Sequence, residues 1–73
     1  MPSAPWPVPE VWPGADGEPV SCRDKLRVLA ANHKELAGVM QDAFDDALVI
    51  GVDEAAMRRI LIDLVQRMKA PLK

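Results

Sequence analysis

The sequence predicts an all-α fold, a helical hairpin with an extended N-terminal arm. Three observations lead to it: apolar residues at heptad spacing within residues 21–50, a second apolar face within residues 53–69, and a cluster of prolines within residues 1–20. We therefore divide the chain into a Pro/Trp-rich arm (1–20), a hairpin (21–70) and a short tail (71–73). Two copies of such a hairpin are expected to associate into a four-helix bundle.

The longer helix is predicted over about residues 21–50. Apolar positions alternate there at steps of three and four, with one histidine among them: Leu26, Leu29, His33, Leu36, Met40, Ala43, Ala47 and Ile50. This spacing is typical of a helix that packs along one face. Ser21 is the expected N-cap, since Asp24 follows it at capping-box spacing. An alternative is a break near Asn32, but the unbroken repeat favours one continuous helix.

The shorter helix is predicted over about residues 53–69. Gly51 ends the first helix, and Asp53 is a good N-cap because its carboxylate accepts from free backbone N–H groups of the first turn. A broad apolar face follows, formed by Met57, Ile60, Leu61, Leu64, Val65 and Met68. Acidic residues precede basic ones by four positions on the exposed side, which stabilises a helix.

The arm contains six of the seven prolines and both tryptophans. Such a proline density excludes a helix and a central strand, so we expect an extended segment. Trp6 and Trp12 gain too much from burial to remain in a solvated tail. We favour docking of the arm on its own helices; the alternative is a recognition peptide for another protein's groove.

The two helices differ in length, at about 45 Å and about 25 Å for a rise of 1.5 Å per residue. In an antiparallel hairpin Met68 lies opposite about Leu36, so the second helix does not cover the start of the first. The arm or a second copy has to cover it. The predicted partner-binding residues are Trp6, Trp12, Leu26, Leu29, His33 and Leu36.

An acidic patch, Asp42, Asp45 and Asp46, lies near the end of the first helix, where the dipole disfavours negative charge. We expect Asp46 to pair with Arg58 across the hairpin, and Asp45 with Arg59. Docking of a basic partner, or weak cation binding, is the less favoured alternative, because helical carboxylates lack the loop oxygens that hard cations prefer.

Catalytic chemistry is scarce in this composition. The chain has one His, one Cys, two Ser and no Tyr, and Cys22 and His33 lie about 16 Å apart along one helix. We therefore expect no enzyme activity, no cofactor and no metal. A lone cysteine and the lack of a long apolar segment favour a cytoplasmic protein without a membrane span. A net charge of −2 gives no electrostatic reason to bind nucleic acid.

The predicted function is a small protein–protein interaction module, an accessory subunit or regulator. It would act through the exposed apolar half of the first helix, and through the Trp arm in addition, on a second copy of itself and on another protein. The alternative is a nucleic-acid-binding regulator, because residues 43–62 resemble a helix-turn-helix motif in the spacing of Ala47, Gly51, Met57 and Ile60. Asp53 and Glu54 stand where such a motif contacts bases, which argues against this reading.

Overall fold

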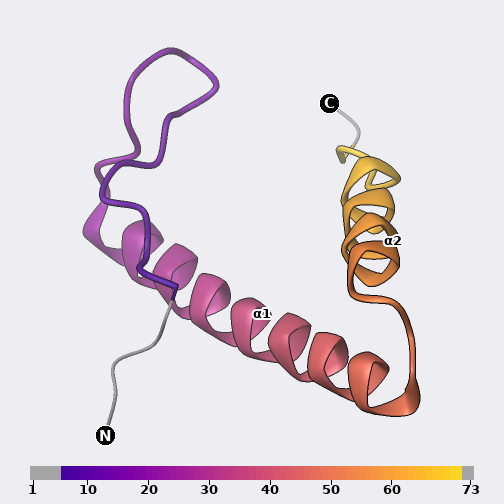
Figure 1. Cartoon of the computed structure of the whole chain (residues 1–73). Coiled ribbons are helices and arrows are strands. Elements are labelled where there is room, and N and C mark those ends of the chain that lie inside the picture. The colour runs from indigo at the N-terminus through magenta and orange to yellow at the C-terminus, as the bar shows by residue number, and fades with distance from the viewer. Residues whose placement is uncertain (1–5, 72–73) are drawn as a thin grey trace, which may run out of the picture. The chain divides into compact units, whose positions relative to one another are not determined.

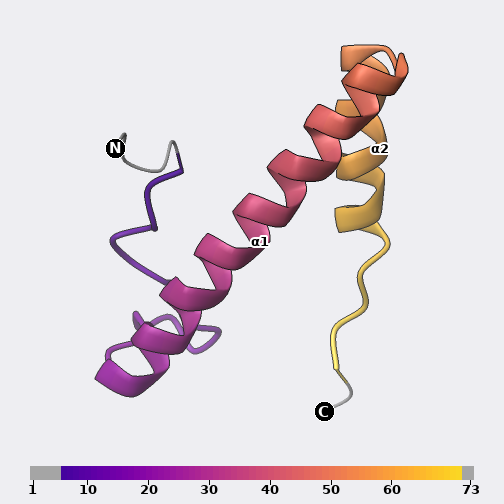
Figure 2. The ribbon, with the colours of Figure 1, turned by 90° about the horizontal axis from the view of Figure 1, so that it is seen from below.

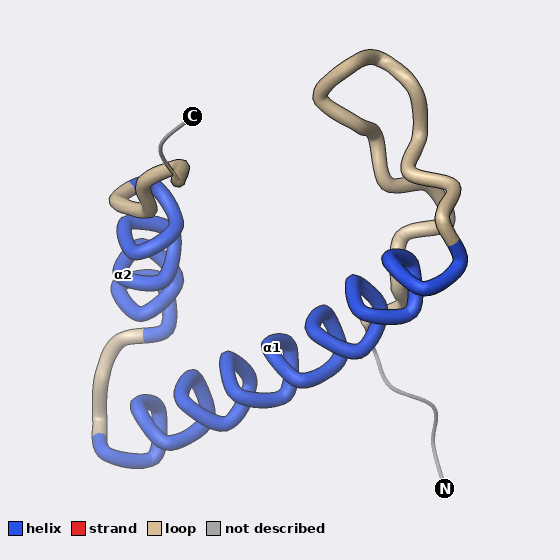
Figure 3. The backbone as a smooth tube through the Cα atoms, turned by 180° about the vertical axis from the view of Figure 1, so that it is seen from behind, coloured by secondary structure: helices blue, strands red, loops and turns tan. Residues whose placement is uncertain are grey.

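The computed structural model describes residues 6–71. It contains two helices, α1 (Arg23–Ile50) and α2 (Glu54–Gln66), and no strand within the described residues (Figures 1 and 3). The all-α helical hairpin is therefore confirmed. α1 runs without interruption through Asn32, as the unbroken repeat predicts. Compared with the predicted bounds, α1 begins two residues later and α2 ends three residues earlier.

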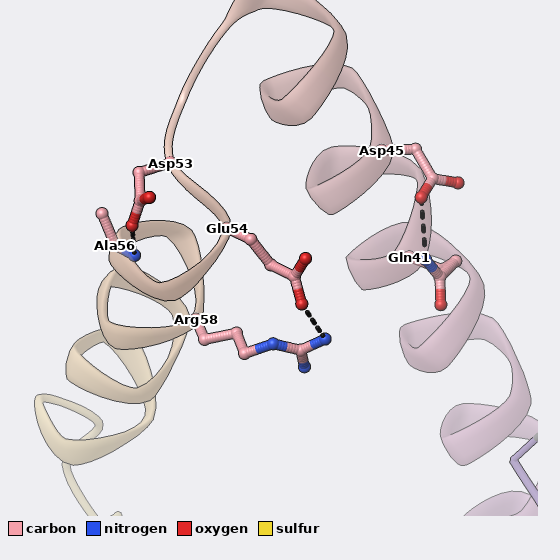
Figure 4. Close-up of polar contacts among 6 residues, drawn as sticks. All are labelled: Gln41, Asp45, Asp53, Glu54, Ala56 and Arg58. Carbon is pink, nitrogen blue, oxygen red and sulfur yellow. Dashed lines mark hydrogen bonds and ion pairs between the residues drawn. The ribbon is translucent and has the colours of Figure 1, made fainter.

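The bend between the helices is built from backbone hydrogen bonds and one side-chain cap. Gly51 adopts a φ of 122°, which favours glycine, and the Val52 N–H donates to the Ala47 carbonyl at 2.8 Å, as in a Schellman ending. Asp53 then caps α2, since its Oδ2 accepts from the Ala56 N–H at 2.9 Å (Figure 4). The predicted N-cap of the second helix is confirmed.

The start of α1 differs from the prediction by one position. The carbonyl of Cys22, not that of Ser21, accepts the first helical bond, from the Leu26 N–H at 2.9 Å. Cys22 therefore occupies the N-cap position.

The chain forms two compact units that divide inside α1, one up to Val39 and one from Met40 onward. No residue in the described part of the chain is buried, so each unit has a half-buried interior instead of a core. The half-buried members of the α1 stripe include Leu26, Leu29, His33, Ala37, Met40, Phe44 and Ala47. On α2 the half-buried apolar residues are Ala56, Met57 and Leu61.

The arm folds into a closed loop directly before α1. The Val20 N–H donates to the Trp12 carbonyl and the Gly14 N–H to the Glu18 carbonyl, both at 2.9 Å. A Cβ at Gly14 would overlap the Glu18 carbonyl oxygen, so the close approach of these two backbone segments requires a glycine at position 14. The loop therefore returns the chain to the start of α1 and fixes the place of Trp12.

Neither α1 nor α2 combines the length and the apolar character that crossing a bilayer requires.

Candidate interaction surfaces

The first part of the described arm, in indigo, passes beside α1, and the rest forms a loop that stands away from the start of the helix (Figures 1 and 2). The rings of Trp12 and His33 meet edge to face, with centroids 6.2 Å apart and planes at 84°, a geometry that aromatic rings prefer. The Nδ1 atom of His33 is buried and has no hydrogen-bond partner within the described residues. Ring packing therefore positions His33, and two of the predicted partner-binding residues contact each other within one chain.

Trp6 also lies beside α1. Together with Pro7 and Val8 it borders an open hollow of about 540 Å³, whose other side is formed by Arg27, Ala30, Ala31 and Lys34. Leu26 and Leu29 are half-buried in the same unit. Leu36 is 56% exposed, and two valines on the same helix, Val28 and Val39, are exposed to a similar degree, at 58% and 61%. Of the predicted surface on α1, Leu36 thus remains open.

In the unit from Met40 onward, the two helices meet around Phe44. The guanidinium of Arg58 lies over the Phe44 ring, 4.8 Å from its centroid, within the range of a cation–π contact. The same guanidinium donates to Glu54 Oε2 at 3.1 Å (Figure 4). Met57 and Leu61 are half-buried in this unit. The first two turns of α2 therefore carry the contact with α1.

The rest of the apolar face of α2 is open. Ile60, Leu64, Val65 and Met68 have exposed fractions of 50%, 54%, 55% and 70%. These residues were predicted to lie on an apolar face but were not among the predicted partner-binding residues. The signal that would have found them is the width of that face, because one neighbouring helix covers only part of so broad a stripe.

The prediction that the acidic patch forms ion pairs across the hairpin is wrong. Within residues 6–71 neither Asp45 nor Asp46 forms an ion pair, and Asp45 instead accepts from Gln41 Nε2 at 2.9 Å (Figure 4). Arg58 has a nearer partner in Glu54 on its own helix. All three residues of the patch are exposed, and no cluster of three or more metal-ligating side chains occurs in the described part of the chain.

Cys22 is exposed and lies at the start of α1, close to the backbone N–H groups of the first turn. Hydrogen bonds from the backbone of Lys25 and Asp24 lower the pKa of the Cys22 thiol below its ordinary value, because they stabilise the thiolate. His33 lies eleven positions further along α1 and packs against Trp12. The two residues are about 16 Å apart along the helix axis, too far for a nucleophile and its base.

Comparison with protein families, with curated proteins and with solved structures gave no match for this chain.

Proposed function

We propose that this chain is a small non-enzymatic protein-interaction module, an accessory subunit or regulator, whose fold is completed by association. The observation that carries the proposal is the lack of any buried residue in the described part, together with the exposure of thirteen large apolar side chains there. A hairpin of this size gains little stability from its own interior, and small domains of this kind commonly rely on oligomerisation. Association would remove the exposed apolar side chains from water.

Two regions provide the apolar contact area in this proposal. On α1 it is Leu36 with Val28 and Val39, which remain exposed while the arm lies on the same unit. On α2 it is the open part of the apolar face. Trp6 and Trp12 contribute to the module by holding the arm on α1, and a partner that binds the arm would have to displace that packing.

The absence of enzyme activity is part of the proposal. It is supported by the placement of the two most reactive side chains: His33 packs against Trp12, and Cys22 lies exposed at the start of α1. The two are about 16 Å apart along the helix axis, too far for a nucleophile and its base.

Light scattering of the full chain over a wide concentration range, combined with quenching of tryptophan fluorescence, tests the proposal. We expect the mass to rise from 8.0 kDa toward twice that value, with Trp12 shielded from the quencher at every concentration. A constant monomer mass up to about millimolar concentration, where even weak specific contacts form, would contradict self-association. Salt-sensitive retention on a DNA column would favour the helix-turn-helix alternative.

A further inference from the structure

The apolar face of α2 has a pattern that fits a second copy of itself. Its members are Met57, Ile60, Leu61, Leu64, Val65 and Met68; Met57 and Leu61 are half-buried, and the other four are exposed. Four of them, Met57, Leu61, Leu64 and Met68, follow heptad spacing, with Ile60 on one flank and Val65 on the other. Met68 stays next to the helix because its N–H donates to the Val65 carbonyl at 3.2 Å.

We propose that two copies of this chain pair antiparallel through the apolar face of α2. The two-fold axis crosses that face at the level between residues 62 and 63 of each helix. This inference rests on the proposed function and names the partner of its α2 surface. In this register Leu61 forms a layer with the second copy's Leu64, and Met57 forms a layer with the second copy's Met68. A two-fold axis repeats each layer, so the four positions along the middle of the face are matched by apolar residues.

The charges at the ends of α2 favour the antiparallel direction over the parallel one. Asp53 and Glu54 lie at the start of the helix, whereas Arg67 and Lys69 lie at its end or just beyond. Antiparallel pairing brings the acidic start of one copy near the basic end of the other, and it also opposes the two helix dipoles. Parallel pairing would bring like charges together at both ends.

The flanks of the face also allow this pairing. Glu54 pairs with Arg58 at 3.1 Å, and Asp63 pairs with Arg67 at 2.7 Å, each within one helix. These pairs partly neutralise the charges beside the apolar face. In addition, the first turns of α2 already contact α1 around Phe44, while Ile60, Leu64, Val65 and Met68 remain at least half exposed. Each α2 would then lie between its own α1 and the second copy, which gives a four-helix arrangement.

Disulfide trapping distinguishes the register. Two single-cysteine variants, Met57→Cys and Met68→Cys, are made in a Cys22→Ser background and oxidised separately and as a mixture. Antiparallel pairing predicts cross-linked dimer in the mixture alone, because residues 57 and 68 are opposite each other, whereas two copies of residue 57 are about 16 Å apart along the axis. A disulfide requires Cα atoms within about 7 Å. Cross-linking of each variant with itself would overturn the proposal in favour of parallel pairing.

A matched pair of substitutions identifies the face. Leu64 and Ile62 have almost the same exposure, 54% and 55%, but residues two apart on a helix point to nearly opposite sides. Leu64→Asp should raise the dimer dissociation constant about 30-fold or more, because it removes apolar burial and places a carboxylate in the contact. Ile62→Asp should leave it nearly unchanged. Circular dichroism of both variants verifies that the hairpin remains folded.

The outcomes separate this inference from the proposed function. If the unmodified chain dimerises but Leu64→Asp dimerises equally well, the α2 pairing is wrong while the interaction module stands. If the unmodified chain remains monomeric by light scattering, both self-association and the α2 pairing are wrong. Dimerisation that Leu64→Asp abolishes and Ile62→Asp retains, with cross-linking in the mixture alone, supports the inference.

Discussion

In the unit up to Val39, an extended arm lies on α1, whereas in the unit from Met40 onward a second helix leaves most of its own apolar face open. The arm places Trp12 against His33 and Trp6 beside Ala30 and Ala31. α2 contacts α1 chiefly through its first two turns, around Phe44. The difference is that the proline-rich arm covers part of α1 from within the chain, whereas most of the apolar face of α2 stays exposed.

The two units also differ in how the segment that packs on α1 is kept ordered. Prolines reduce the conformational entropy that the arm loses when it becomes ordered, and the loop bonds of Gly14 and Val20 fix its path. α2 is kept helical by local features: the Asp53 cap and two ion pairs at i,i+4 spacing. A helix that is locally supported in this way needs less contact with α1. We infer that its remaining apolar residues are available for association.

The largest expected effect is on the stability of the unit from Met40 onward. Phe44→Ala removes the ring beneath Arg58 and most of the aromatic contact between the two helices. Because Phe44 is half-buried, we expect a loss of about 2 kcal/mol, below the 3–5 kcal/mol typical of a fully buried Phe. Thermal denaturation followed by circular dichroism measures it. Val49→Ala is the control, since Val49 is 87% exposed and its loss should cost under about 0.5 kcal/mol; equal effects would contradict the contact described.

The next effect is on the arm alone. Gly14→Ala forces a Cβ against the Glu18 carbonyl, so we expect the loop to open at a cost of about 1–3 kcal/mol of local strain. Tryptophan emission should shift to the red while the helical signal persists. Gly38→Ala is the matched control, because a Cβ there meets nothing and should stabilise α1 by about 0.5–1 kcal/mol. An unchanged emission spectrum in Gly14→Ala would show that Trp12 does not depend on the loop.

A smaller effect is expected at the bend. Asp53→Ala removes the acceptor for the Ala56 N–H and should cost about 1 kcal/mol, whereas Asp53→Asn should retain most of the cap. Chemical denaturation of both variants provides the comparison. If the alanine and asparagine variants are equally destabilised, the negative charge and not the cap is what stabilises the start of α2.

The smallest effect is chemical and leaves the fold intact. The pKa of Cys22 is lowered by backbone hydrogen bonds from Lys25 and Asp24, so in the folded chain the thiolate forms at lower pH than in the unfolded chain. Alkylation by iodoacetamide should therefore reach half of its maximal rate at a lower pH in buffer than in denaturant, because the thiolate is the nucleophile. Coincident pH profiles would show that the hydrogen bonds do not persist in solution.

Much of the helical architecture could be predicted because it depends on local signals. The stripe from Leu26 to Ala47 determines which side of α1 faces inward, and Gly51 and Asp53 determine where the chain bends. The N-cap of α1 was displaced by one residue, from Ser21 to Cys22. Two neighbouring residues with polar side chains compete for that position, and the loop bond between Val20 and Trp12 sets the path by which the chain enters α1.

Side-chain partners were less predictable. Asp46 and Arg58 were matched by counting from the bend, but Arg58 pairs with Glu54 and lies over Phe44. An exposed ion pair across a hairpin contributes little energy, so a partner one turn away on the same helix prevails. The exposed apolar residues of α2 were not predicted as an interaction surface, because the prediction compared only the lengths of the two helices. The width of the apolar face of α2, from Ile60 on one flank to Val65 on the other, indicates that one neighbouring helix leaves part of it uncovered.

Amide hydrogen exchange as a function of protein concentration tests the central contrast most directly. If the arm packs on α1 of its own chain and the apolar face of α2 contacts a second copy, the amides of Gly14 and Val20 exchange at rates that do not depend on protein concentration. The amides from Ile60 to Val65 then become better protected as concentration rises. Exchange that slows with concentration in the arm, with no change along α2, would contradict this account.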